Sequence, residues 1–105
     1  MKVVLFIDTS NNKTIKVGLT IDGEDHLVER EIDYRKVQVV LPILGALLTE
    51  RKLSLRDITE IIVNEGPGSF TGVRVGVAIA NALGFLLNVP VNKKKIGEFV
   101  EPRYS

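Results

Sequence analysis

The chain has 105 residues, of which 45% are hydrophobic and 26% charged, with a net charge of +1 and no cysteine. This composition is that of an ordinary folded domain and is too apolar for a disordered segment. The small net charge excludes a large basic field for nucleic acid, and the missing cysteines exclude disulfides and thiolate chemistry. One domain with a modest core is expected, and a cytoplasmic location is expected because no signal peptide is visible.

The first third of the chain has the pattern of three strands. Residues 3–7 are a continuous run of β-branched, aliphatic and aromatic residues, which is typical of a central strand covered on both faces. Residues 15–21 alternate between apolar and small or polar residues, as in a half-buried strand. Asp22-Gly23 favours a tight hairpin turn, and residues 26–32 then return as a third strand. An antiparallel meander is predicted.

Two helical patterns and two further strands follow the meander. Residues 34–52 carry apolar residues at helical spacing, residues 58–64 read as a strand parallel to the first, and residues 71–87 form a second helix. Val89-Pro90-Val91 is predicted to open a final strand, and residues 93–105 form a tail without a clear period. The order β-β-β-α-β-α-β indicates an α/β fold with a five-stranded mixed sheet, of the ribonuclease H-like or actin-like type.

The first predicted helix carries more apolar surface than one contact with a sheet requires. One apolar stripe would pack on the sheet, and Val39, Ile43 and Ala46 form a second stripe to one side of it. Pro42 lies inside the same helix and should bend it or mark the start of its regular part. The second stripe predicts a further packing partner, in this chain or in another protein.

The second predicted helix carries a row of small residues on one face. Glycine inside a helix costs about 0.5–1 kcal/mol relative to alanine, so repeated glycines imply the close approach of another helix. The row from Val75 to Leu86 is predicted to face the sheet instead. The apolar run 73–91 contains Arg74 and Asn81, so it is interpreted as a buried helix and not as a membrane span. The small-residue row consists of Gly72, Gly76, Ala80 and Gly84.

Residues 66–76, Gly-Pro-Gly-Ser-Phe-Thr-Gly-Val-Arg-Val-Gly, are the most constrained stretch of the chain. Residues 66–68 build a tight, stiff turn, and Ser69 and Thr71 can both cap the helix that follows. A glycine-rich turn at a helix start can receive an anion, but the stretch lacks the Gly-Lys-Ser/Thr ending of a P-loop. A structural or interface role is therefore favoured over phosphate binding.

Three other features could carry chemistry. In actin-like ATPases an acidic residue followed by small hydroxyl residues at the end of the first strand holds metal and phosphate, so Asp8, Thr9 and Ser10 are weak candidates for binding ATP with Mg²⁺. A simple turn is the commoner use of these residue types. His26 is the only histidine and predicts no metal site. The run Lys93-Lys94-Lys95 is favoured as solvated and not as an RNA contact.

Several of these segments together resemble the TsaB (YeaZ) family. Residues 66–76 match the signature of that family almost letter for letter, and Ile7-Asp8-Thr9-Ser10 resembles its N-terminal segment. Leu41-Pro42 resembles the leucine–proline step of its first helix, and residues 53–58 resemble the stretch before its fourth strand. The matches run in order from residue 3 to about 91, so the chain is identified as a short form that resembles the N-terminal domain only. Members are usually about twice as long, and residues 101–105 faintly resemble their Pro-x-Tyr ending.

The resemblance implies an actin-like (ASKHA) half-fold and a scaffold without catalytic activity. TsaB proteins pair with the catalytic subunit TsaD, and with the ATPase TsaE, in transferring threonylcarbamoyl to adenosine 37 of tRNA. The two long helices are the implied association surface, which also predicts a homodimer when the chain is alone. Strong direct tRNA binding and membrane attachment are not expected.

A small nucleotide-binding enzyme of the actin-like group remains the alternative to a scaffold. For the scaffold, partner contacts are expected from the second stripe of the first helix, the glycine turn and the small-residue row. The expected interface residues are Val39, Ile43, Ala46, Gly68, Ser69, Phe70, Thr71, Gly72, Arg74, Gly76, Ala80 and Gly84.

Overall fold

The computed structural model describes residues 1–32 and 36–103, without the side chains of residues 36 and 37. Its elements follow the predicted order as far as the second helix, while the predicted helix start at residue 34 lies outside the described residues. The elements are β1 (Val3–Asp8), β2 (Thr14–Ile21), β3 (Glu24–Glu31), α1 (Lys36–Glu50), a short 3₁₀ turn (Leu55–Asp57), β4 (Glu60–Val63) and α2 (Phe70–Leu87).

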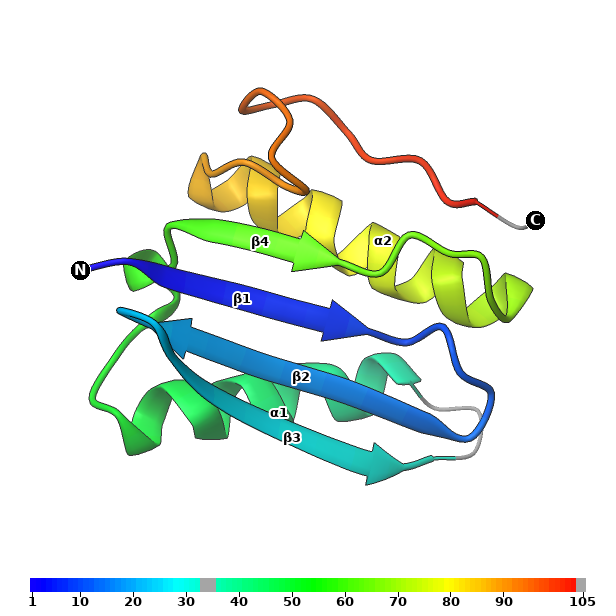
Figure 1. Cartoon of the computed structure of the whole chain (residues 1–105), viewed down its shortest axis with the longest axis horizontal. Helices are drawn as coiled ribbons and strands as arrows, with labels where there is room; N and C mark the ends of the chain where they lie inside the picture. The colour runs from blue at the N-terminus through cyan, green and yellow to red at the C-terminus, as the bar shows by residue number, and fades with distance from the viewer. Residues whose placement is uncertain (33–35, 104–105) are drawn as a thin grey trace.

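The strands form one mixed sheet in the order β3-β2-β1-β4 (Figure 1). β1 pairs antiparallel with β2 and parallel with β4, and β2 pairs antiparallel with β3. Asp22 and Gly23 at the β2–β3 turn have φ values of 48° and 88°, the positive values that a type I′ hairpin turn requires. The predicted meander and the parallel fourth strand are thus confirmed.

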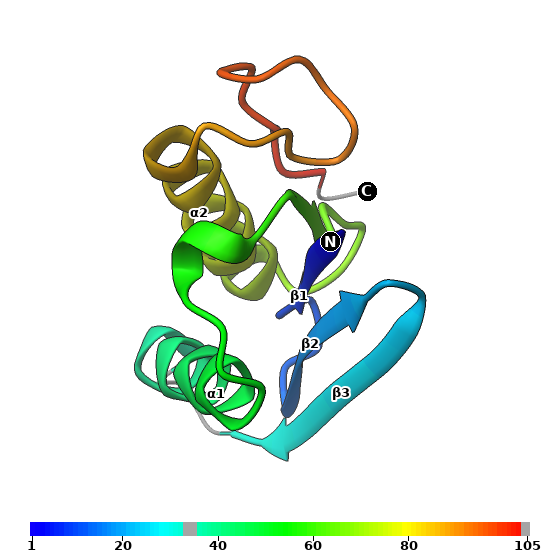
Figure 2. The same cartoon turned by 90° about the vertical axis from the view of Figure 1, so that its left-hand side faces the viewer.

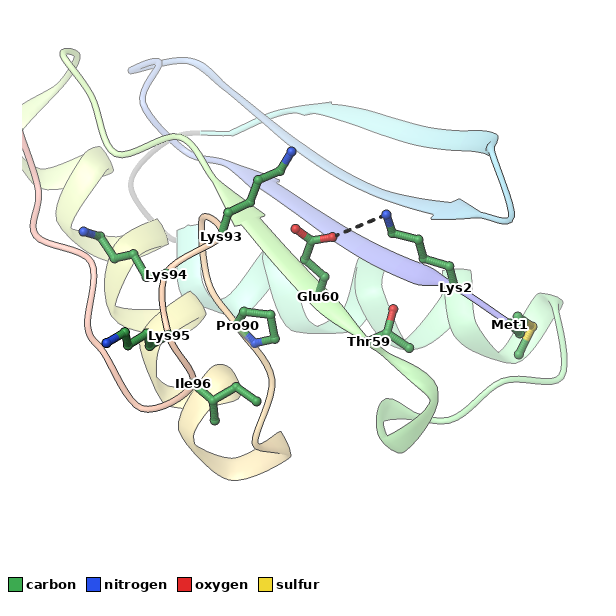
Figure 3. A pocket seen from close by; sticks show the side chains of 9 residues that line it. All are labelled: Met1, Lys2, Thr59, Glu60, Pro90, Lys93, Lys94, Lys95 and Ile96. Atoms are coloured by element: carbon green, nitrogen blue, oxygen red, sulfur yellow. Dashed lines mark ion pairs between the residues drawn. The ribbon is translucent and has the colours of Figure 1, made fainter.

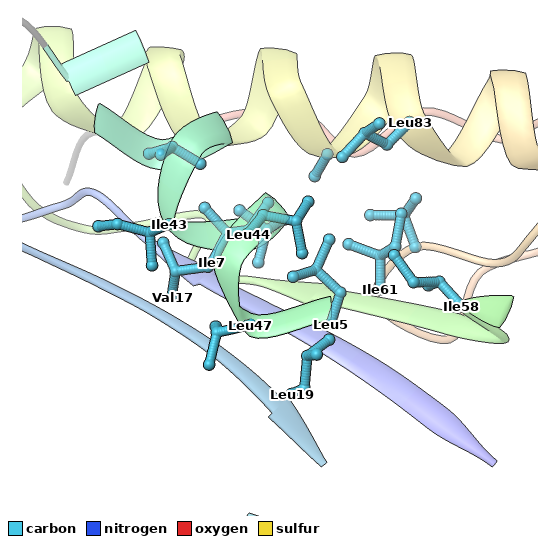
Figure 4. Packing of buried hydrophobic residues seen from close by; sticks show 14 of the residues in the cluster. Leu5, Ile7, Val17, Leu19, Ile43, Leu44, Leu47, Ile58, Ile61 and Leu83 are labelled. Atoms are coloured by element: carbon cyan, nitrogen blue, oxygen red, sulfur yellow. The ribbon is translucent and has the colours of Figure 1, made fainter. Parts of the chain in front are cut away.

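Both helices cover the same face of the sheet (Figure 2). Alternate residues of β1, β2 and β4 point to that face and are almost fully buried, because successive side chains of a strand point to opposite sides. Figure 4 shows these side chains packed against Leu44 and Leu47 of α1 and Leu83 of α2. The sheet contributes Val3, Leu5, Ile7, Ile15, Val17, Leu19, Ile61 and Val63 to this core.

The opposite face of the sheet carries no helix among the described residues (Figure 2). Val4, Phe6 and Ile62 on this face are half-buried, and Leu27 is 58% exposed beside Gly18. These residues border a hollow of about 320 Å³. The prediction that β1 is covered on both faces is therefore wrong for the part of the chain that the structure describes.

The predicted fifth strand is reduced to a single bridge, so the sheet has four strands and not five. Val91 bridges Ile61 in parallel, with Ile61 N–H donating to the Pro90 carbonyl and Asn92 N–H donating to the Ile61 carbonyl. Asn92 then takes the left-handed conformation at φ 51°, which ends the strand. Its side-chain amide replaces the backbone partner on β4, because it accepts from Val63 N–H at 2.8 Å and donates to the Val63 carbonyl at 3.0 Å.

Helix α2 passes a test of length and composition for a membrane span, with a mean hydropathy of 1.6 over its 18 residues. A core helix of a folded domain passes the same test. Gly72, Gly76, Ala80 and Gly84 are all buried within the described fold. The apolar composition of α2 is explained in part by this internal packing.

Candidate partner surface and the polar turn

The turn between β4 and α2 is held against the end of β1 by hydrogen bonds through Ser10 and Asn64. Ser69 N–H donates to the Ser10 carbonyl at 2.8 Å, and Asn64 Nδ2 donates to Ser10 Oγ at 3.2 Å. Asn64 Oδ1 also accepts from Gly66 N–H at 2.9 Å. The predicted stiff turn therefore has a polar framework in which Asn64 contacts Ser10, 54 residues earlier in the sequence.

Asp8 belongs to the same polar cluster. Its Oδ1 accepts from Ser10 Oγ at 2.7 Å and from Ser10 N–H at 3.0 Å. Burial alone would raise the pKa of Asp8, but hydrogen bonds from the Ser10 hydroxyl, the Ser10 amide and Asn64, with the positive charge of Lys16, together lower it. The lowered pKa favours the ionised carboxylate. Its hydrogen bond from Ser10 N–H forms a local side-chain-to-backbone turn, which is common for aspartate.

Thr9 is enclosed within the fold. Its side chain is fully buried, and its hydroxyl donates a hydrogen bond to the Gly72 carbonyl in the first turn of α2. A Cβ at position 76 would clash with Thr9 Oγ1, so the glycine there allows α2 to lie directly on the end of β1. Thr9 therefore ties the end of β1 to α2, and its use in nucleotide binding stays a prediction.

The first two glycines of the turn also serve close packing. Gly66 has φ +106°, and a Cβ there would overlap the Arg103 carbonyl of the C-terminal tail. Arg103 N–H donates to the Glu65 carbonyl at 2.6 Å, so the tail runs along the turn. A Cβ at Gly68 would lie 2.7 Å from Ser10 Cβ. These contacts give a packing reason for both glycines.

The small-residue row of α2 faces the protein's own sheet and not another helix. Gly72, Gly76, Ala80 and Gly84 are buried, and side chains at Gly76 and Gly84 would clash with Thr9 and Val91 respectively. The expectation that this row meets a partner helix is therefore wrong. The error arises because a strand end and a bridge residue can approach a helix as closely as another helix does.

The row that was predicted to face the sheet does so only in part, because Leu83 belongs to the core and Ile79 packs against the core. Leu86 is 75% exposed, and Val75 and Ile79 are only half-buried, whereas Leu83 is buried. On α1, Ile43 from the predicted second stripe is buried in the core, Val39 is half-buried and Ala46 is exposed. The residues that are exposed on the two helices therefore differ in part from those that the sequence predicts to be exposed.

The outer sides of α1 and α2 make one surface that faces away from the sheet (Figure 2). We call it the helical face. On α2 it includes a hollow of about 350 Å³ lined by Thr71, Arg74, Val75, Ala78 and Ile79. The helical face consists of the exposed residues Leu41, Pro42, Gly45, Ala46, Phe70, Thr71, Arg74, Ala78, Ala82, Phe85 and Leu86.

The predicted interface residues differ in exposure: five are buried and Val39 is half-buried, and the buried ones are Ile43, Gly72, Gly76, Ala80 and Gly84. Ala46, Gly68, Phe70, Thr71 and Arg74 are exposed, and Ser69 is half-buried because its side chain accepts from Gly72 N–H at 3.3 Å as the N-cap of α2. The helical face also contains Ala78, Phe85 and Leu86, which are exposed and are not among the predicted interface residues. Their placement follows from the true orientation of α2, and the signal that could have found it is the set of residues directly opposite the glycines.

The fold and the signature turn agree with comparisons to known proteins. The sequence model described as "TsaD: tRNA N6-adenosine threonylcarbamoyltransferase" matches residues 31–93. The chain therefore belongs to the TsaD family of proteins, in its TsaB or YeaZ branch, and has the actin-like fold.

The particular relatives support this placement. The chain is 35% identical over 92 residues to the "tRNA threonylcarbamoyladenosine biosynthesis protein TsaB" of Bacillus subtilis, covering 85% of this chain and 39% of that protein. It is 35% identical over 88 residues to the protein of the same name from Escherichia coli, covering 84% and 38%. "YeaZ from Pseudomonas aeruginosa" superposes with a TM-score of 0.82 at 32% identity, covering 90% and 44%. The chain spans about two fifths of the length of these relatives.

Proposed function

We propose that this chain is a non-catalytic scaffold that pairs with a TsaD-type catalytic subunit in the synthesis of threonylcarbamoyladenosine on tRNA. The names of the Bacillus subtilis and Escherichia coli relatives support the pathway. The observation that carries the scaffold role is the helical face, which is large and nearly free of charge. Apart from Lys36 and Glu50 at the ends of α1, Arg74 is the only charged residue in the two helices.

The helical face has the residue types of a protein-binding surface. Phe70, Phe85 and Leu86 are 57%, 69% and 75% exposed, and large exposed apolar groups that gather on one surface mark interaction sites. Gly45 and Ala46 on α1 are small and exposed, with open space around a Cβ at Gly45, so a partner helix could approach closely there. The face therefore offers aromatic anchors beside a shallow helical surface, as interfaces commonly do.

Arg74 is placed to orient a partner on this apolar surface. Its guanidinium carbon lies 5.5 Å from the centre of the Phe70 ring, so the charge rests on an aromatic face and stays exposed. An exposed arginine at an otherwise apolar surface can pair with a carboxylate of the partner. We infer that the same face also forms the homodimer when the chain is alone, and that a TsaE-like ATPase joins the pair in the cytoplasm.

Pairing can be tested by size exclusion with light scattering, using the TsaD-type subunit of the same organism. The wild-type chain should elute with that subunit, and Ala78→Arg should abolish the complex because it places a long charged side chain at the hollow on the α2 part of the helical face. Leu27→Arg is the matched control, since Leu27 is 58% exposed on β3 and lines the hollow with Val4, Phe6 and Ile62 on the opposite face of the sheet. A complex that survives Ala78→Arg while the protein remains folded would rule out this surface.

The rival function is a small nucleotide-binding enzyme that uses Asp8, Thr9, Ser10 and the glycine turn. Asp8 already accepts two hydrogen bonds from Ser10, and the side chain of Thr9 is buried. Both observations favour the scaffold over a nucleotide-binding site. We expect no heat of binding when ATP and Mg²⁺ are titrated into the chain alone by calorimetry. Micromolar binding that disappears in Asp8→Ala would establish the rival function instead.

A further inference from the structure

A shallow hollow of about 820 Å³ lies beside the start of β4 (Figure 3). Four of the residues that line it are lysines, and they come from two distant parts of the chain. Lys2 precedes β1, whereas Lys93, Lys94 and Lys95 follow the single bridge residue Val91. Pro90 and Ile96 add apolar surface to the same hollow.

The lysines around the hollow carry more positive charge than the nearby carboxylates neutralise. Lys2 Nζ lies 3.9 Å from Glu60 Oε1, and Lys94 Nζ lies 3.6 Å from Glu98 Oε1. Neither lysine is enclosed, so water and salt weaken both pairs and an incoming anion can replace them. Lys93 and Lys95 have no ion pair among the described residues. The four lysines that line the hollow therefore outnumber Glu60 and Glu98, the two carboxylates paired with them.

The lysine loop (residues 93–96) is fixed to the fold at both ends, which the sequence alone did not predict. Before it, Asn92 makes two side-chain hydrogen bonds to the backbone of Val63, and Lys94 N–H donates to the Val91 carbonyl at 3.1 Å. After it, Val100 is buried against α2. A loop that is already ordered loses less conformational entropy on binding than a free tail does. The backbone of the lysine loop is therefore held in place, while its lysine side chains are exposed to solvent.

We propose that the lysine loop and Lys2 bind the phosphodiester backbone of RNA. Lysine ammonium groups on long stems contact phosphates without reading bases, so the contact would position an RNA and not select its sequence. The hollow is large enough for more than one phosphate group, and none of the residues that line it belongs to the helical face. The choice of RNA over other polyanions rests on the proposed function. The net charge of +1 predicts that the contact is weak and strongly salt-dependent.

The test is fluorescence anisotropy of a fluorescein-labelled tRNA transcript titrated with the full chain over a series of salt concentrations. The variant Lys93→Gln/Lys95→Gln should bind about tenfold more weakly at about 50 mM salt, and its salt dependence should become shallower by about one to two phosphate contacts. The matched control is Lys13→Gln/Lys52→Gln, which changes the net charge equally at two exposed lysines elsewhere. The control should bind nearly as the wild type does.

Three outcomes would overturn the RNA contact. They are an absence of binding by the wild type at low salt, an equal loss in the control variant, and equal Lys93- and Lys95-dependent binding to poly-glutamate or to vesicles of anionic lipid. The titration uses the chain alone. Its result is therefore independent of the pairing experiment, and either proposal can fail without the other.

Discussion

Asn81 holds both backbone groups of Val100 with its side-chain amide. Asn81 Nδ2 donates to the Val100 carbonyl at 2.9 Å, and Val100 N–H donates to Asn81 Oδ1 at 2.9 Å. The Val100 side chain is itself buried, with 2% of its surface exposed. This pair ties the irregular C-terminal tail to the middle of α2 and explains why an otherwise apolar helix contains an asparagine.

Replacing Asn81 by leucine should destabilise the fold and release the tail. The change leaves the amide and carbonyl of Val100 without their partner, which costs about 1–3 kcal/mol if they stay buried. Urea unfolding should show the loss, and hydrogen exchange of the Val100 amide should become faster. Asn12→Leu, at an exposed position in the β1–β2 turn, is the control and should change stability little. Unchanged exchange at Val100 in Asn81→Leu would contradict the tethering role.

Gly76→Ala should destabilise the protein although alanine is the better helix former. The added methyl group would clash with Thr9 Oγ1, and overpacking of this kind costs about 1–3 kcal/mol. Thr9→Ala removes that oxygen, so Gly76→Ala should cost less in a Thr9→Ala background than in the wild type. The double-mutant cycle in urea measures this coupling. Strictly additive effects would show that the helix does not rest on Thr9.

Gly45→Ala is the matched comparison on the other helix. A Cβ at Gly45 meets nothing within 4 Å, so alanine there should stabilise the fold by about 0.5–1 kcal/mol through helix propensity alone. The same urea experiment tests it. A loss of stability in Gly45→Ala would indicate that the outer side of α1 is not as open as the structure shows.

The pH dependence of stability should contain a contribution from Asp8. Its folded-state pKa lies below the ordinary value of 3.8, so Asp8 adds stability above that pH and the gain is lost as pH falls through the folded pKa. Asp8→Asn should therefore weaken the decline in unfolding free energy between neutral pH and pH values below 3.8. An acid decline that is identical in wild type and Asp8→Asn would exclude this contribution.

The order of helices and strands was predictable because it depends on local patterns of apolar and polar residues. Strand alternation, the Asp22-Gly23 turn and the helical spacing of α1 and α2 each depend on residues close in sequence. The orientation of α2 was not predictable in this way. It depends on Thr9, which lies 63 residues before its hydrogen-bond partner Gly72, and no local pattern distinguishes a glycine row facing a strand from one facing a helix.

The edge of the sheet and the C-terminal tail also combine features that local sequence predicts with features that distant residues determine. A short β-branched run at Val91 predicts a strand, but only the structure shows that the Asn92 side chain occupies the edge of β4 in its place. The tail was judged irregular from sequence, and it has no regular element in its described part. The tail is held by hydrogen bonds from Val100 to Asn81 and from Arg103 to Glu65. Contacts between residues this far apart cannot be identified from a single sequence.

The most direct test of the scaffold role is reconstituted threonylcarbamoyl transfer to tRNA with the TsaD-type and TsaE-type proteins of the same organism. Transfer should depend on adding this chain, should be lost with Ala78→Arg on the helical face, and should persist with Leu27→Arg on the opposite side of the sheet. Transfer that proceeds equally without the chain, or equally with folded Ala78→Arg, would contradict the proposal that this chain acts as a scaffold through the outer sides of α1 and α2.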